Sequence, residues 1–93
     1  MVTESPTFKK AVEDSRKLKS KPTDDDLLHI YGLYKTGTGA DIATAEKPGM
    51  FDLKGKAKMK AWTKVVEEDK LTPGQAQQEY VKKVEGLKGS CGF

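Results

Sequence analysis

Cysteine, histidine and tryptophan each occur once in this chain of 93 residues. The lone cysteine, Cys91, excludes an internal disulfide and a multi-cysteine metal site. One histidine, His29, is too few to build a metal site with that cysteine. No nucleophile signature surrounds any Ser, His or Asp. We therefore expect no metal, no cofactor, no catalytic residues and no enzymatic activity.

Long apolar runs are also missing. No stretch of about 18 apolar residues occurs, so we expect no membrane span. The polar start, MVTESPTFKK, lacks the apolar segment of a secretory signal. The excess of positive charge is mild, since 17 Lys and Arg stand against 14 Asp and Glu, and a net charge of +3 suits a local patch for a small anion. We expect a cytoplasmic monomer that binds no nucleic acid.

Apolar residues recur at helical spacing along most of the chain, which predicts a single all-α domain over residues 1–93. Start signals for helices occur at Ser5-Pro6, at Thr23 before three aspartates, and at Thr72-Pro73. The residue before Pro22 avoids the α region and separates the first two helices. The predicted helices span roughly residues 5–20, 23–37, 52–69 and 72–88.

A segment without clear periodicity, residues 38–51, separates the second and third predicted helices. It contains the turn-forming pair Pro48-Gly49. Connections of this length in a compact domain are usually functional, or are surface loops that pack on the domain.

Lys58 is out of place in the third predicted helix. At roughly 100° per residue it projects from the middle of an apolar arc that includes Ala61 and Val65, and Lys54 lies one turn before it. A charged lysine on a core-facing stripe is costly unless its ammonium reaches water or an anion. Two interpretations stay open: a lysine that extends along the rim of the bundle to solvent, or an anion site at the mouth of a groove.

Two tyrosines and a lysine share one face of the second predicted helix. Tyr31, Tyr34 and Lys35 are related by three- and four-residue spacing, which brings side chains together on a helix. Tyrosines at such spacing usually belong to the core, with the hydroxyl at the surface. Beside a lysine, they can also hold a planar base and a phosphate. Tyr80, on the apolar stripe of the fourth helix, allows the same two interpretations.

The segment YGLYKTGTGADIATAEKPGMFDLKGKAKMKAW, residues 31–62, resembles the acyl-CoA-binding protein family. That family's motif has the form Y-x-x-Y-K, then a turn, then R/K-P-G-M and a K-G-K-A-K block ending in A-W. Further matches extend the resemblance over nearly the whole chain: Phe8, Leu18, Lys21-Pro22, Tyr80, Val84 and Leu87. The resemblance implies an up-down-down-up bundle of four helices, with a long loop between helices two and three and a shallow ligand cavity.

The resemblance also implies a ligand, a long-chain fatty acyl-CoA, and a role for each site residue. The 3′-phosphate of the CoA ribose would meet Lys35, Lys58 and the Tyr31 hydroxyl, and the adenine would lie against Tyr34. The remaining CoA head and the thioester would contact Arg16, Lys54 and Tyr80, and the acyl chain would be sheltered by Leu27 and Leu28. The implied function is non-catalytic binding, transport and buffering of medium- to long-chain acyl-CoA, with transient contacts to acyl-CoA-using enzymes.

The chain departs from the family's common pattern at four places. The family more often has lysine at the position of Arg16, and Met59 replaces a frequent aromatic residue. An extra residue lies near Ala45, and the segment between Trp62 and Tyr80 is a few residues longer. These changes bear on the shape of the groove and on the packing of the third helix.

Two other classes of function remain as alternatives. A small basic helical nucleic-acid-binding domain would place the lysines of the third helix on phosphates and would bind DNA with a steep dependence on salt. An enzyme acting on CoA thioesters would need a nucleophile and a base, and the sequence offers no such pair.

Overall fold

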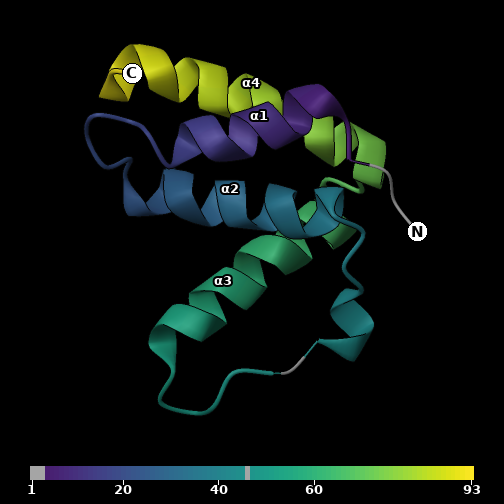
Figure 1. The fold of residues 1–93 in the computed structure, drawn as a ribbon. Coiled ribbons are helices and arrows are strands. Elements are labelled where there is room, and N and C mark those ends of the chain that lie inside the picture. Colours follow the sequence, from purple (N-terminus) through teal and green to yellow (C-terminus); the bar gives the residue numbers. More distant parts are fainter. Residues whose placement is uncertain (1–3, 46) are drawn as a thin grey trace.

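The computed structural model describes residues 4–45 and 47–93, so the first three residues of the expected domain and residue 46 lie outside the described part. Four α-helices cover most of it: α1 (Pro6–Ser15), α2 (Asp24–Gly37), α3 (Leu53–Thr63) and α4 (Pro73–Cys91). The α2–α3 connection contains a 3₁₀ turn, η1 (Ile42–Thr44), and a π-helical turn, η2 (Lys64–Glu68), continues α3. Figure 1 shows α1 and α4 running in one direction and α2 and α3 in the other, which confirms the predicted up-down-down-up order.

Each α-helix begins after a side chain that accepts a hydrogen bond from the first turn. Ser5, Thr23 and Thr72 accept the N–H groups of the residues three positions later, at 3.1–3.2 Å, as their cap signals predict. The Gln75 side chain returns a bond to the Thr72 N–H, which completes a capping box. Asp52 caps α3 in the same way at 2.9 Å. These local bonds place the start of each of the four α-helices.

The predicted end of the first helix is wrong, because α1 stops at Ser15 and not near Ser20. The N–H groups of Lys19 and Ser20 donate to the carbonyl oxygens of Gly92 and Cys91, each at 3.0 Å. A backbone N–H engaged with the far end of the chain cannot continue the helical ladder. The same contact holds the end of α4, which extends to Cys91, beyond the predicted end near residue 88. The third predicted helix, 52–69, is α-helical only to Thr63, where α3 ends, and the π-helical turn η2 follows it.

The core lies between α1, α2 and α4 and is closed by η2. Its fully buried large side chains are Phe8, Leu33, Val65 and Val84. The Phe8 ring meets the Tyr80 ring edge-on, with centroids 5.1 Å apart. Burying a side chain of this size contributes about 1.5–3 kcal/mol, so this cluster supplies much of the folding free energy.

Buried polar groups fix the three core helices relative to one another. Gln77 of α4, only 5% exposed, donates from Nε2 to the Gly37 carbonyl at 2.8 Å and accepts the Ser5 N–H at 3.0 Å. The buried carboxylate of Asp14 pairs with Lys88 at 2.8 Å. The hydrogen bond from Lys88 lowers the pKa of Asp14, and the same bond raises the pKa of Lys88. These contacts join α4 to both α1 and α2.

A glycine lets α3 lie directly against α2. A Cβ atom at Gly32 would lie 2.9 Å from the Ala61 carbonyl oxygen and 3.0 Å from Cγ2 of Val65. Among the α-helices, α3 makes its main contacts with α2, and it diverges from the other helices toward its first residue (Figure 1). The resulting wedge between α2 and α3 is where the grooves described below are found.

Candidate functional site

Tyr31 lies near two lysine side chains that come from different helices. The Nζ atom of Lys35, one turn later on α2, is 5.9 Å from the centre of the Tyr31 ring. The Nζ atom of Lys58, on α3, is 5.5 Å from the same ring. Lys35 also lies 5.6 Å from the ring of the buried Trp62. The fold therefore brings two ammonium groups to one phenol, although their residues are 23 positions apart in the sequence.

Neither ammonium group has a carboxylate partner among residues 4–45 and 47–93. A cation–ring contact at an exposed position is worth only about 0.5–1 kcal/mol. Two cations that share one ring also repel each other. An anion placed between Lys35 and Lys58 would relieve this repulsion, so the arrangement favours a negatively charged ligand. Lys58 is exposed, which fits both interpretations of its place in the sequence, a lysine at the rim of the bundle and an anion site.

A groove with a volume of about 330 Å³ opens beside this pair of lysines. It is lined by residues of α2, of α3 and of the connection before α2: Lys21, Asp24, Leu27, Leu28, Tyr31, Lys54, Ala57 and Lys58. Five of the residues implied by the family resemblance therefore lie around one groove. We call this the leucine groove, after Leu27 and Leu28.

A hollow of about 460 Å³ lies behind Lys58, between α3 and the loop that precedes it. Tyr31 and Lys58 line both this hollow and the leucine groove. Lys47 of the loop also lines the hollow and is a cation that sequence reasoning missed. Met59 lines it too, at the position where the family often has an aromatic residue. The lysine-rich sequence alone could not show that the loop folds back onto α3.

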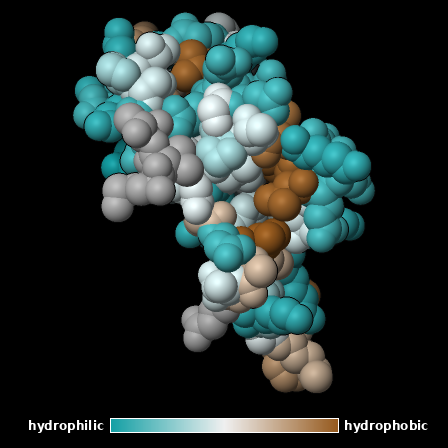
Figure 2. Space-filling model, turned by 90° about the vertical axis from the view of Figure 1, so that its right-hand side faces the viewer, coloured by the Kyte–Doolittle hydropathy of each residue, from teal (hydrophilic) through white to brown (hydrophobic). Residues whose placement is uncertain are grey.

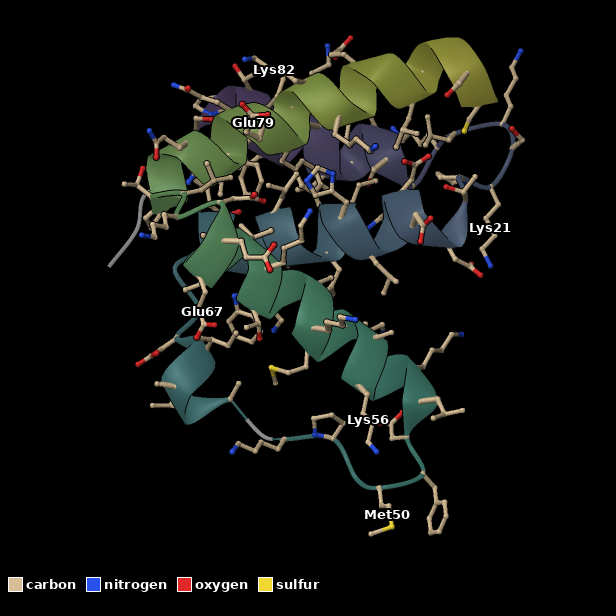
Figure 3. The ribbon with its side chains drawn as sticks, turned by 180° about the vertical axis from the view of Figure 1, so that it is seen from behind. Lys21, Met50, Lys56, Glu67, Glu79 and Lys82 are labelled. Carbon is tan, nitrogen blue, oxygen red and sulfur yellow. The ribbon has the colours of Figure 1, made fainter. Side chains whose placement is uncertain are left out.

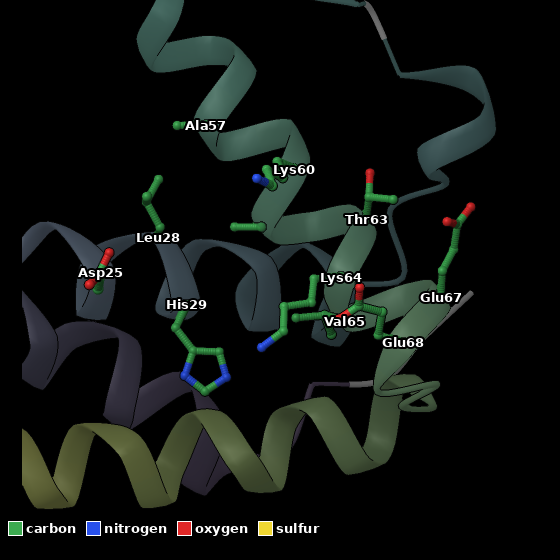
Figure 4. Close-up of a pocket in the computed structure, with 11 residues that line it drawn as sticks. Asp25, Leu28, His29, Ala57, Lys60, Thr63, Lys64, Val65, Glu67 and Glu68 are labelled. Carbon is green, nitrogen blue, oxygen red and sulfur yellow. The ribbon is translucent and has the colours of Figure 1, made fainter.

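A larger groove of about 650 Å³ adjoins the leucine groove, because Leu28 and Ala57 line both. Residues of α2, α3 and η2 line it, and Figure 4 shows His29 directed toward α4. Burial lowers the pKa of His29, helped by the neighbouring Lys83 and Lys64, and this shift favours the neutral imidazole. Acidic and basic side chains both line this groove, so it favours no anion despite its size.

Three of the implied site residues lie on the other side of α2, toward α1 and α4. The Tyr34 ring packs 6.2 Å from the Phe8 ring and 6.3 Å from the Tyr80 ring. Tyr80 is 3% exposed, and its hydroxyl donates to the Ser15 side chain at 3.2 Å. Burial raises the pKa of the Tyr80 phenol, and the bond to Ser15 opposes that rise. Arg16 follows at the end of α1. These residues line none of the three grooves.

Within the described ranges, no group of three His, Cys, Asp or Glu side chains is arranged to hold a metal ion. Cys91 has a free thiol and is half-buried at the last turn of α4, where its carbonyl accepts hydrogen bonds from Ser20. Of the helices described, none has the length and apolar character needed to cross a bilayer.

Comparison with known proteins places the sequence in a family. The family model described as acyl-CoA-binding protein matches residues 5–84. The chain belongs to the acyl-CoA-binding protein family. The "Acyl-CoA-binding protein homolog" of Manduca sexta is 45% identical over 86 residues, which cover 92% of both chains. "Acyl-CoA-binding protein homolog 1" of Caenorhabditis elegans is 47% identical over 81 residues, 87% of this chain and 90% of the relative.

Solved structures agree with that assignment. The crystal structure of Oryza sativa Acyl-CoA-Binding Protein 2 superposes with a TM-score of 0.78 at 31% sequence identity, covering 90% of this chain and 89% of the rice protein. The predicted all-α fold of an acyl-CoA-binding protein is therefore confirmed.

Proposed function

We propose that this protein binds medium- to long-chain fatty acyl-CoA esters without changing them chemically, and that it transports and buffers them. A CoA ester joins a polyanionic nucleotide, a polar arm and an apolar tail. A site for it needs cations, an aromatic surface and an apolar channel side by side. The observation that carries the proposal is the approach of Lys35 and Lys58 to Tyr31, at the edge of the leucine groove.

The phosphorylated head of the ligand belongs at the two lysines. In this proposal the 3′-phosphate of the CoA ribose takes hydrogen bonds from Lys35, Lys58 and the Tyr31 hydroxyl. Each charge-assisted contact contributes about 1.5–3 kcal/mol. The absence of carboxylate partners for these lysines in the described part of the chain supports the assignment, because no ion pair has to be broken.

The rest of the head extends across α2. We assign Tyr34 to the adenine, and Arg16 and Tyr80 to contacts with the CoA head and the thioester region. Their support is their proximity to one another, since Tyr34 and Tyr80 share an aromatic cluster and Arg16 follows the hydroxyl partner of Tyr80. Lys54 is supported differently, because it lines the leucine groove itself.

The acyl tail belongs in the leucine groove. Burial of each methylene contributes roughly 0.8 kcal/mol, so affinity should rise about fourfold per methylene until the groove ends. The larger groove adjoins this one at Leu28 and Ala57 and offers space for the end of a longer chain.

The other parts of the proposal rest on the sequence. We propose a cytoplasmic monomer that requires no cofactor or metal and that meets acyl-CoA-using enzymes transiently. The lack of a nucleophile–base pair supports binding over catalysis. Membership of the family does not favour the alternative of a nucleic-acid-binding domain.

Titration calorimetry of the full chain with palmitoyl-CoA, free CoA and palmitate tests the proposal. We expect palmitoyl-CoA to bind much more tightly than either fragment, because only the whole ester fills both parts of the site. Equal affinity for palmitate and palmitoyl-CoA would contradict a site anchored by the nucleotide. Hydrolysis of palmitoyl-CoA by the purified protein would contradict the non-catalytic assignment.

A further inference from the structure

Three large apolar side chains are exposed at one end of the molecule. Met50 and Leu53 are each 76% exposed and Phe51 is 92% exposed. They lie in and just after the turn that leads into α3, at the end of the molecule farthest from α4 (Figure 1). Figure 3 shows Met50 at this extremity, and Figure 2 shows hydrophobic atoms projecting there. We call these three residues the apolar tip. Clustered exposed apolar side chains on a folded protein mark an interaction surface.

The turn that carries the apolar tip is held by hydrogen bonds. The carbonyl of Met50 accepts a bond from Nζ of Lys56 at 2.8 Å, and the Asp52 N–H donates to the Gly49 carbonyl at 3.1 Å. The Asp52 carboxylate caps α3 through the Gly55 N–H. Because the backbone is fixed in this way, the outward position of the apolar side chains is built into the fold.

Positive charge is concentrated around the same turn. Residues 47–60 contain five lysines and one aspartate, whereas the other 79 residues contain 12 basic and 13 acidic side chains. The only carboxylate of this segment, that of Asp52, is engaged at the start of α3. Lys47, Lys54 and Lys56 are exposed on either side of the apolar tip. An apolar wedge between lysines complements a bilayer whose headgroups are anionic.

We propose that the apolar tip docks on anionic lipid membranes. Met50, Phe51 and Leu53 enter the boundary between headgroups and acyl chains, and the flanking lysines contact the lipid phosphates and carboxylates. The attachment is peripheral and reversible. Since Lys54 also lines the leucine groove, docking places that groove beside the bilayer. This surface goes beyond the proposed binding of acyl-CoA, and either property can hold without the other.

Vesicle flotation with the full chain tests the proposal. Vesicles of phosphatidylcholine with phosphatidylserine are compared with vesicles of phosphatidylcholine alone. Phe51→Ser is compared with Phe93→Ser, which alters an exposed ring at the opposite end of the molecule. We expect binding only to the anionic vesicles, weakened by salt. Phe51→Ser should lower the vesicle partition coefficient roughly tenfold, and Phe93→Ser should leave it unchanged.

Insertion is checked by fluorescence. The unsubstituted protein has one tryptophan, Trp62, which is 3% exposed and serves as the internal control. Vesicles containing brominated lipid should quench the new emission of a Phe51→Trp variant and leave the emission of the unsubstituted protein unchanged. Phe51→Ser should bind palmitoyl-CoA as the unsubstituted protein does, which separates loss of docking from loss of the fold or of the ligand site.

Three results would overturn the proposal. One is equal binding to neutral and anionic vesicles, and another is flotation of Phe51→Ser at the unsubstituted level. The third is a lipid-free dimer that Phe51→Ser abolishes, because such a dimer would assign the apolar tip to a second copy of the chain. Failure to bind palmitoyl-CoA together with normal flotation would refute the proposed function alone and leave the membrane surface standing.

Discussion

The lysines of α4 and the lysines at the α2–α3 wedge differ in what they contact. Lys83 and Lys88 of α4 form ion pairs with carboxylates of α2 and α1, at 2.6 and 2.8 Å. Lys35 and Lys58 contact aromatic rings and no carboxylate within the described residues. The same residue type therefore stabilises the fold on one side of α2 and stays available for a ligand on the other side.

The two sides of α2 also differ in how completely their buried polar side chains are hydrogen-bonded or paired. Toward α1 and α4, the buried side chain of Gln77 is hydrogen-bonded and Asp14 is paired. Toward α3, the buried indole N–H of Trp62 has no hydrogen-bond partner in the part of the chain that the structure describes. An unsatisfied buried donor costs about 1–3 kcal/mol. An unsatisfied buried donor therefore destabilises the packing of α2 against α3, whereas the named polar groups toward α1 and α4 are satisfied. Local costs of this kind are common where a protein binds a ligand.

The largest effect is expected on ligand affinity when both lysines at the α2–α3 wedge are removed. The double variant Lys35→Ala/Lys58→Ala should bind palmitoyl-CoA at least about 100-fold more weakly, because two charge-assisted contacts are lost. Calorimetry with palmitoyl-CoA and its 3′-dephospho analogue measures the effect. The double variant should no longer distinguish these two ligands.

The matched control carries the same change of charge on α4, as Lys82→Ala/Lys83→Ala. This control should keep the discrimination between the two ligands. If Lys35→Ala/Lys58→Ala still prefers palmitoyl-CoA by the unsubstituted ratio, the lysines do not hold the 3′-phosphate.

A pair of glycine substitutions tests the close approach of α3 to α2. Gly32→Ala should lower the free energy of unfolding by about 1–3 kcal/mol, because the new methyl group meets the Ala61 carbonyl. Gly86→Ala lies within α4, where a Cβ meets nothing within 4 Å, and it should raise that free energy by about 0.5–1 kcal/mol. Urea unfolding measures both changes. Stabilisation by Gly32→Ala would show that α3 is not packed as described.

The ion pair of α4 should make stability depend on pH. The hydrogen bond from Lys88 places the pKa of Asp14 below its ordinary value of 3.8 in the folded protein. The pair's contribution is therefore present above that value and is lost as the pH falls through and below it. Lys88→Met should lower the urea midpoint at pH 7, and the difference should shrink in acid. A difference that stays constant down to acid pH would contradict this role, and Lys82→Met provides an exposed control.

The smallest effect expected is that of a single hydroxyl group. Tyr31→Phe keeps the ring near both ammonium groups and removes only the proposed hydrogen bond to the phosphate. Affinity for palmitoyl-CoA should fall roughly 2- to 10-fold, with the far-UV circular dichroism unchanged. Unchanged affinity would remove the hydroxyl from the phosphate site and would leave the two lysines in it.

What the sequence predicted correctly was local in origin. The caps at Thr23 and Thr72 depend on bonds within one turn, and the starts of α2 and α4 follow from them. The placement of Lys58 on the third helix follows from the same kind of local pattern. The end of α1 was missed because the N–H groups of Lys19 and Ser20 bond to residues about 70 positions away, which no local pattern reveals.

A helical pattern also could not predict that Tyr31 and Tyr34 contact different helices. Tyr31 and Tyr34 were expected to share one face with Lys35, and three-residue spacing permits that. In the bundle, α2 has neighbours on two sides, so Tyr31 lies beside Lys58 of α3 while Tyr34 packs against Tyr80. Only the arrangement of the other helices decides which neighbour each ring meets. The roles of these residues toward a ligand stay predictions.

One crossed measurement tests most directly whether the lysines of the two sides have separate roles. Lys58→Ala and Lys88→Ala are each titrated with palmitoyl-CoA and unfolded with urea. We expect Lys58→Ala to bind at least about tenfold more weakly with an unchanged urea midpoint. We expect Lys88→Ala to lower the midpoint and to bind with unchanged affinity. If folded Lys88→Ala loses as much affinity as Lys58→Ala, the division between a stabilising side and a binding side is contradicted.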